Sequence, residues 1–247
     1  NNKIYAIKIT HPNIREKIRA NIITIGSILQ ICKLLHLLEG MPPINLNVFF
    51  VDHLNQTDLN IEAKNTIYLY EKFTNSVITD IHVPEIIKYN QDYIIESYIN
   101  GCNISDLEEP YKNEAMIKRL SGFMEMLFSY DILFGDSHDG NLLYTKINDT
   151  LHVYYIDCGL VHNINQKLKY DILRIMLSLN KKQYDLLVSI LLPTANKKMQ
   201  TEICYNMNKI SYDNDNQNII LALDPIVQGA LKYKLEISNS ILYFLIL

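Results

Sequence analysis

The most informative part of the sequence is Phe134-Gly-Asp-Ser-His-Asp-Gly-Asn141, which is followed by a hairpin pattern and then by Asp157-Cys-Gly159. Asp136 and Asn141 lie five positions apart, and Asp157 directly follows a strand-like run. Phosphoryl transfer from a nucleotide requires a carboxylate that positions the acceptor, an amide and a carboxylate for the metal ion, and a cation for the phosphates. The stretch supplies the first three groups in the order that kinase catalytic loops use.

The fourth group, a cation, is found in Ala6-Ile-Lys8 near the start of the chain. The surrounding residues alternate as in a strand, which points the Lys8 side chain to the opposite face from Ile7 and Ile9. Its ammonium would lie on the phosphates of the nucleotide, and a carboxylate is needed to hold it. Glu62, on a helix expected to follow, is the predicted partner.

Each of these residues alone has an ordinary structural explanation. Lys8 could be a solvated strand lysine, Glu62 a surface helix charge, and Asp157-Cys-Gly a plain turn after a strand. Together, in the right order and on the expected elements, they favour a kinase-like site. His138 either orients Asp136, contacts phosphate or is structural in the loop, whereas His152 is expected to face outward or to be packed.

Composition excludes several classes of protein. The chain has 247 residues, of which 48% are hydrophobic and 20% charged, so we expect a globular protein of one or two domains. The net charge of −4, without a long basic stripe, argues against a nucleic-acid partner. The four cysteines are at least 46 positions apart and predict reduced thiols in an intracellular protein. The chain is rich in Ile, Asn and Lys and poor in Arg, which we attribute to an A- and T-rich genome.

The periodicity predicts a fold of class α+β, with a small N-terminal lobe (1–100) that contains the sheet and a larger helical lobe (101–247) with the catalytic loop. Strands are expected at 4–10, 85–89, 93–98, 142–146 and 152–156. Helices are expected at 13–39, 54–73, 103–107 and 111–130, and from 165 to the end with breaks at Pro193 and 213–218.

Several segments resemble the UbiB/ADCK (AarF-domain) atypical kinase family. They are Ala6-Ile-Lys-Ile-Thr-His-Pro-Asn13, Thr57-Asp-Leu-Asn-Ile-Glu-Ala-Lys-Asn65, Val83-Pro-Glu, Glu96-Ser-Tyr-Ile-Asn-Gly101 and Asp136-Ser-His-Asp-Gly-Asn-Leu-Leu143. The resemblance implies a protein-kinase-like bilobal fold that binds ATP with Mg²⁺, in a family tied to isoprenoid-quinone and other lipid metabolism and to membranes. It also implies a role for each site residue. These are the phosphate lysine (Lys8), its ion-pair partner (Glu62), the catalytic-loop carboxylate (Asp136) and the metal ligands (Asn141 and Asp157).

The chain departs from the family pattern at several positions. Phe134 and Asp139 stand where the family usually has His and Pro, and Gln56 replaces the first acid of a Glu-x-Asp element whose second acid is Asp58. The Ala-rich nucleotide loop and the Lys-x-Gly-Gln extension would precede Asn1. We therefore expect the first strands of the N-terminal lobe to be missing, and both ends to be cuts in a longer protein.

Three functions remain open. The first is an ATP- and Mg²⁺-dependent kinase or ATPase of the UbiB/ADCK type. The second is a small-molecule phosphotransferase of the aminoglycoside or choline kinase type, which Gly159 disfavours because those enzymes usually carry an acid there. The third is a catalytically degenerate pseudokinase that binds nucleotide. The phosphate acceptor, a protein or a lipid-related molecule, has no sequence signature. Peripheral membrane association is expected from the family, with 237–247 as the candidate docking helix.

Overall fold

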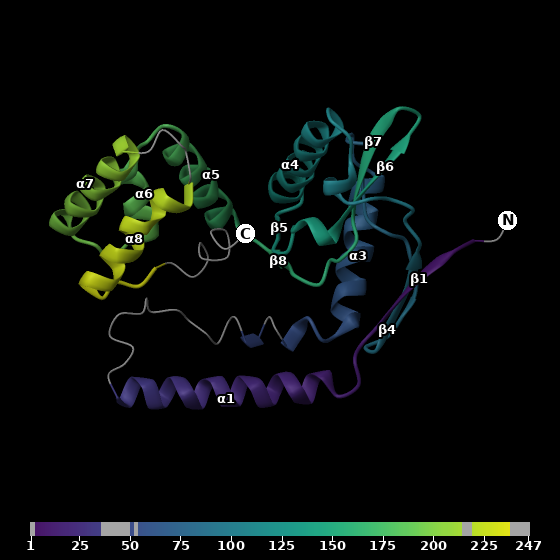
Figure 1. Ribbon diagram of the computed structural model, residues 1–247, viewed down its shortest axis with the longest axis horizontal. Coiled ribbons are helices and arrows are strands. Elements are labelled where there is room, and N and C mark those ends of the chain that lie inside the picture. The colour runs from purple at the N-terminus through teal and green to yellow at the C-terminus, as the bar shows by residue number, and fades with distance from the viewer. Residues whose placement is uncertain (1–2, 36–49, 52–53, 214–218, 238–247) are drawn as a thin grey trace. The chain divides into compact units, whose positions relative to one another are not determined.

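The computed structural model describes residues 3–35, 50–51, 54–213 and 219–237 (Figure 1). The described residues divide into two compact units. The first comprises the described parts of 1–22 and 48–164, and the second those of 23–47 and 165–246. The mixture of helices with small sheets confirms the α+β class. The expected lobe boundary at residue 100 stays a prediction.

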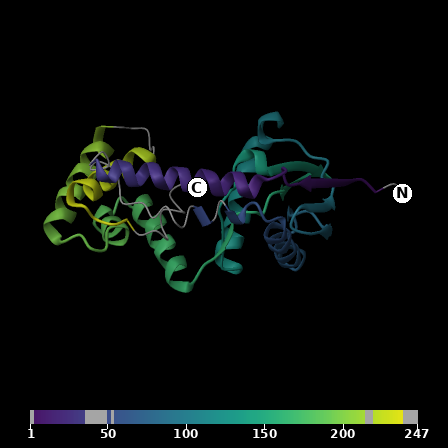
Figure 2. The same ribbon diagram turned by 90° about the horizontal axis from the view of Figure 1, so that it is seen from below.

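The first unit contains all of the described strands. Its strands are β1 (Tyr5–Ile9), β2 (Ile81–His82), β3 (Ile86–Tyr89), β4 (Tyr93–Ser97), β5 (Ile132–Phe134), β6 (Leu142–Ile147), β7 (Thr150–Tyr155) and β8 (Val161–Asn163). Its helices are α3 (Leu59–Thr74), α4 (Tyr111–Ser129) and the short 3₁₀ helices η1 (Ile104–Asp106) and η2 (Asp139–Asn141), together with the beginning of α1 (Ile14–Leu34). Figures 1 and 2 show α1 as one unbroken helix directly after β1.

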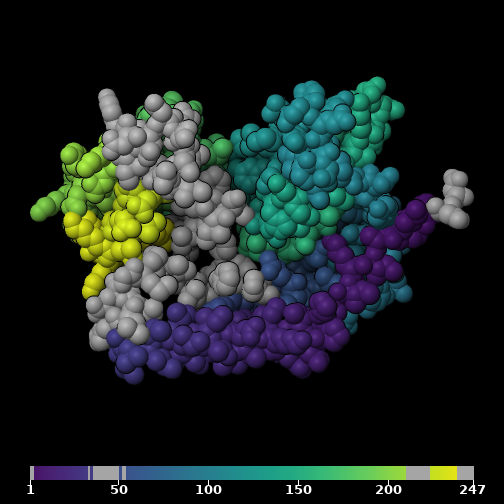
Figure 3. Space-filling model, viewed as in Figure 1, coloured from purple at the N-terminus to yellow at the C-terminus, as the bar shows by residue number. Residues whose placement is uncertain are grey.

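The first sheet has the antiparallel order β1-β4-β3 and carries the predicted lysine strand. Lys8 lies opposite Ile94 of β4 in the strand register. Ile7 and Ile9 are 61% and 74% exposed on the outer face of β1, which lies at the surface in Figure 3. Because side chains alternate along a strand, the Lys8 side chain is directed inward, as the alternation predicted.

Helix α3 packs against this sheet and begins later than expected. The single helix expected at 54–73 is interrupted by a turn at 56–57, and α3 starts at Leu59. The side chain of Asp58 causes this start, because its Oδ1 accepts a hydrogen bond from the backbone N–H of Asn60 at 3.1 Å. Helix α1 ends at Leu34 and residue 35 is a turn, whereas positions 36–39 of the helix expected at 13–39 lie outside the described residues.

Two further sheets complete the first unit. One has the order β2-β7-β6, in which the predicted hairpin β6–β7 is joined by the parallel strand β2, and the other pairs β5 with β8. The strands β2, β5 and β8 are absent from the sequence prediction. A buried cluster that includes Phe73, Phe134 and Tyr155 packs α3, α4 and these strands together.

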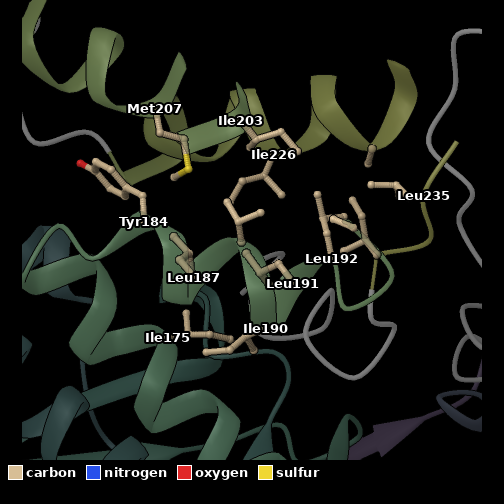
Figure 4. Packing of buried hydrophobic residues seen from close by; sticks show 14 residues of the cluster. Ile175, Tyr184, Leu187, Ile190, Leu191, Leu192, Ile203, Met207, Ile226 and Leu235 are labelled. Carbon is tan, nitrogen blue, oxygen red and sulfur yellow. The ribbon is translucent and has the colours of Figure 1, made fainter. Parts of the chain in front are cut away.

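The second unit is a bundle of α5 (Gln166–Asn180), α6 (Tyr184–Leu191), α7 (Lys197–Asp213) and α8 (Ile219–Tyr233). Its core contains Leu187, Leu191, Ile203, Met207 and Ile226, which converge from α6, α7 and α8 in Figure 4. The predicted break at Pro193 is confirmed, whereas 214–218 lies outside the described residues. Within the described part of the chain, no helix is both long and apolar enough to cross a bilayer. The candidate docking helix lies outside it from residue 238 onward.

Candidate active site

The inner face of β1 brings Lys8 against two carboxylates. The Lys8 ammonium pairs with the carboxylate of Glu62 on α3, and its Nζ lies 3.5 Å from Oε1 of Glu96 on β4. Nζ also donates a hydrogen bond to the backbone carbonyl of Ile156. Burial works to lower the pKa of Lys8, but the charges of Glu62 and Glu96 outweigh it and raise the pKa above its ordinary value. Lys8 is therefore held as a cation.

Glu96 is the residue of this cluster that the sequence prediction did not include. It is 4% exposed, and burial raises its pKa to about 7, although Lys8 opposes this effect. A signal for it exists in the sequence, because Glu96 lies two positions after Ile94 and therefore on the same inward face of the strand as this apolar residue. A charged residue at such a position is rarely buried without a partner.

We predict that Glu96→Gln increases stability at alkaline pH. The pKa of Glu96 is higher in the folded state than in the unfolded state. The contribution of Glu96 to the free energy of unfolding is therefore fully present below about pH 4.5 and is lost as the pH rises through about 7. The variant should therefore exceed the wild type in free energy of unfolding by about 1 to 3 kcal/mol at pH 8, and by much less at pH 5. Urea denaturation at both pH values measures this difference.

The matched control is Glu85→Gln, because Glu85 is an exposed glutamate just before β3. This variant should unfold like the wild type at both pH values. A Glu96→Gln variant that is no more stable than the wild type at pH 8 would contradict the prediction.

Asp157 is fixed at the end of β7 by its own turn. Its Oδ1 accepts a hydrogen bond from the N–H of Gly159 at 2.9 Å, and the preceding carbonyl, that of Ile156, is bound by Lys8. The next carbonyl, that of Cys158, accepts a hydrogen bond from Nδ2 of Asn65 on α3 at 2.9 Å. Asn65 is the second residue that the sequence prediction did not assign, although it follows Glu62 by three positions and so shares its helix face.

A cavity of about 350 Å³ opens at this cluster. Its lining includes Lys8, Glu62 and Asp157, together with residues from the beginning of α1 and the turn before α3. With Glu96 behind Lys8, the cluster sets one ammonium against three carboxyl groups. This excess of acidic groups favours a ligand that brings a cation into the cavity.

The loop with Asp136 is held by internal hydrogen bonds. Nδ2 of Asn141 donates to the backbone carbonyl of Asp136 at 3.1 Å, which leaves the amide oxygen as the end that can bind a cation. Nδ1 of His138 accepts the N–H of Gly140 at 3.0 Å, so the proton of the neutral ring is on Nε2, which lies 3.5 Å from Oδ1 of Asp136. This geometry places His138 beside Asp136.

A chain of contacts connects all five predicted site residues within the first unit. Lys8 contacts the carbonyl of Ile156, whose N–H donates to the carbonyl of Asn141 at 3.0 Å, and Asn141 holds the backbone of Asp136. Asp136 and Asn141 do not line the cavity. They are connected to it through the hydrogen-bonded backbone next to Asp157, which does line it. The chemical roles of the five residues stay predictions.

His82 on β2 and His152 on β7 form a pair that is separate from the candidate site. Nε2 of His82 and Nδ1 of His152 are 2.8 Å apart, and their rings stack. His152 is thus packed against a neighbour and takes no part in the contacts of the candidate site.

Residues 1–191 match the model of the ABC1 atypical kinase-like domain. The chain belongs to this family. The predicted resemblance to UbiB/ADCK proteins is thereby confirmed, because curated members that match the chain carry the UbiB and ABC1 names.

Two curated relatives illustrate how far the similarity to this ABC1 domain extends. A probable protein kinase UbiB of Vibrio cholerae is 28% identical over 180 residues, which are 68% of this chain and 32% of the relative. The mitochondrial ABC1 family protein YPL109C of Saccharomyces cerevisiae is 26% identical over 189 residues, which are 69% of this chain and 28% of the relative. The chain therefore spans about a third of the length of these relatives.

A solved structure confirms the fold of this ABC1-family chain. The Rv3197–erythromycin complex from Mycobacterium tuberculosis superimposes with a TM-score of 0.57, and the match covers 93% of this chain and 67% of that one. The sequence identity is 16%, so the likeness concerns the fold alone.

Proposed function

We propose that the chain is the catalytic part of an ATP- and magnesium-dependent atypical kinase or ATPase. The observation that carries the proposal is the partly buried Lys8–Glu62 ion pair, in which Lys8 is joined through the Ile156 carbonyl to the turn that presents Asp157. A lysine paired with a helix glutamate beside an Asp-x-Gly turn is the arrangement that kinases use to hold nucleotide phosphates.

Each site residue has a task in this proposal. Lys8 neutralises phosphate oxygens, and Glu62 fixes the direction of its ammonium. Asp136 positions the hydroxyl or water that attacks the terminal phosphorus and accepts its proton. Asn141 and Asp157 would hold Mg²⁺, which when bound would neutralise charge on the phosphates.

The donor set fits magnesium that arrives with a nucleotide. In the described part of the chain, no three His, Cys, Asp or Glu side chains cluster to hold a metal on their own. Mg²⁺ in nucleotide sites is typically bound by one or two carboxylates together with phosphate oxygens and water. The carboxylate of Asp157 and the amide oxygen of Asn141 would provide such a partial site.

We also propose that the protein acts in isoprenoid-quinone or other lipid metabolism, as the resemblance to the UbiB/ADCK family implies. The UbiB name of the curated relatives supports it. The sequence does not identify the phosphate acceptor, and the intracellular, membrane-associated location stays a prediction.

Thermal unfolding with Mg-ATP tests nucleotide binding. We predict that millimolar Mg-ATP stabilises the full-length protein, by about 2.7 kcal/mol at a concentration of 100 times Kd, because ligand that binds only the folded state shifts the unfolding equilibrium. Lys8→Ala and Asp157→Ala should remove most of this stabilisation. Lys88→Ala, an exposed lysine of the same sheet, is the control and should retain it.

The outcomes separate the candidate functions. A wild-type protein that millimolar Mg-ATP does not stabilise would overturn both enzyme functions. Stabilisation without any phosphate release, from ATP alone or with candidate acceptors, would favour a nucleotide-binding pseudokinase instead.

A further inference from the structure

Helix α4 places one arginine across the loop that carries Asp136. Nη1 of Arg119 lies 2.6 Å from Oδ1 of Asp139, and Nη2 donates a hydrogen bond to the backbone carbonyl of Ser137. Ser137 directly follows Asp136. The guanidinium therefore contacts the loop at two points, on either side of His138.

The backbone of the same residue contacts the strand that leads to Asp157. The carbonyl of Arg119 accepts a hydrogen bond from the hydroxyl of Tyr155 at 2.8 Å. Tyr155 is fully buried at the end of β7, two positions before Asp157. The ring approaches α4 this closely because residue 122 is glycine, where a Cβ would lie 2.7 Å from the tyrosine hydroxyl oxygen.

We propose that Arg119 is a positioning residue that fixes the loop of Asp136 relative to the strand of Asp157. Its side chain holds the loop, its backbone holds the strand, and the rigid α4 connects the two. This inference rests on the proposed function, because the distance between acceptor-positioning and metal-binding groups matters for phosphoryl transfer. A displacement of about 1 Å in such a site can reduce the rate about 100-fold.

The chemistry of the side chain supports this assignment. A guanidinium presents several N–H groups in a rigid fork, so it can bind a carboxylate and a carbonyl at the same time, whereas a lysine ammonium is a flexible point charge. Asp139 is largely exposed, and an exposed ion pair contributes little to stability. The effect of Arg119 is therefore expected on the geometry of the loop more than on the stability of the fold.

The neighbouring residue offers a matched control. Lys118 lies on the same turn of α4 and pairs with Asp80, which precedes β2 and is remote in sequence from the loop. The side chain of Lys118 is 14% exposed and that of Arg119 is 32% exposed. Removal of the Lys118 side chain should therefore lower the stability of the fold at least as much as removal of the Arg119 side chain. Comparison of the two variants separates positioning from packing.

The experiment measures phosphate release from Mg-ATP by full-length wild type, Arg119→Ala, Arg119→Lys and Lys118→Ala. We expect Arg119→Ala to lower kcat about 10- to 100-fold with the KM for ATP within about 2-fold, and Arg119→Lys to recover only part of the loss. Guanidinium ion at low millimolar concentration should raise the kcat of Arg119→Ala, whereas methylammonium should not. Lys118→Ala should keep the kcat of the wild type.

A second readout does not depend on catalysis. The N–H groups of Gly140 and Asn141 bind His138 within the loop, and their hydrogen exchange should become about 10-fold faster in Arg119→Ala but not in Lys118→Ala. Unchanged exchange, or a kcat loss equal in the two variants, would overturn the inference. If the wild type itself releases no phosphate, the proposed function fails, and the exchange rates alone decide whether Arg119 holds the loop.

Discussion

The Asp136→Asn variant is expected to release phosphate from Mg-ATP about 10²- to 10⁴-fold more slowly than the wild type, with nucleotide binding within about 2-fold. The substitution removes the proposed proton acceptor but retains the shape of the side chain. It also retains the loop, because Asn141 binds the backbone carbonyl of residue 136 and not its carboxylate. The effect should therefore appear in kcat and not in the KM for ATP.

The control is Asp149→Asn in the turn between β6 and β7, where the side chain is 96% exposed. It removes the same charge at the opposite end of β6 from the loop and should leave kcat unchanged. Single-turnover phosphate release measures the chemical step, and thermal unfolding with Mg-ATP measures nucleotide binding separately. If Asp136→Asn and the wild type release phosphate at equal rates, either another residue accepts the proton or the release comes from a contaminant.

The second large effect is expected in the helical unit. Leu191 on α6 is fully buried in the core shown in Figure 4, among side chains from α7 and α8. Leu191→Ala removes buried methyl groups and leaves a cavity, so the free energy of unfolding should fall by about 2 to 5 kcal/mol. Urea denaturation followed by circular dichroism measures this loss.

Leu177→Ala is the corresponding control, because Leu177 lies on α5 and is 52% exposed. It should change the free energy of unfolding by less than about 0.5 kcal/mol. Equal effects of the two substitutions would contradict the assignment of Leu191 to the core.

The elements that the sequence predicted are those whose signals are local. In β1 the apolar residues alternate, and polar turns mark the β3–β4 and β6–β7 hairpins, so these elements can be found in a short window of sequence. Strand β5 gives no such signal. Its residues Ile132–Phe134 are buried on both faces, and its partner β8 lies beyond the hairpin, so neither alternation nor a nearby turn indicates it.

The residues of the candidate site also fall into those that local sequence signals predict and those that they do not. Asp136, Asn141 and Asp157 have a fixed spacing around one loop and hairpin, and Lys8 and Glu62 could be paired because each lies on an element with a clear period. The contacts of Glu96 and Arg119 could not be predicted, because they depend on how β4 lies beside β1 and how α4 lies against the loop. These are properties of packing, which a single sequence does not specify residue by residue.

Cys158, between Asp157 and Gly159, offers a chemical measure of how this turn moves. Its thiol is fully buried, and burial raises its pKa to about 12. Alkylating reagents attack the thiolate, so the residue should react only while the surrounding core is open. With Cys32, Cys102 and Cys204 replaced by serine, the alkylation rate would report how often the turn that carries Asp157 opens, and a nucleotide that binds beside this turn should slow the reaction.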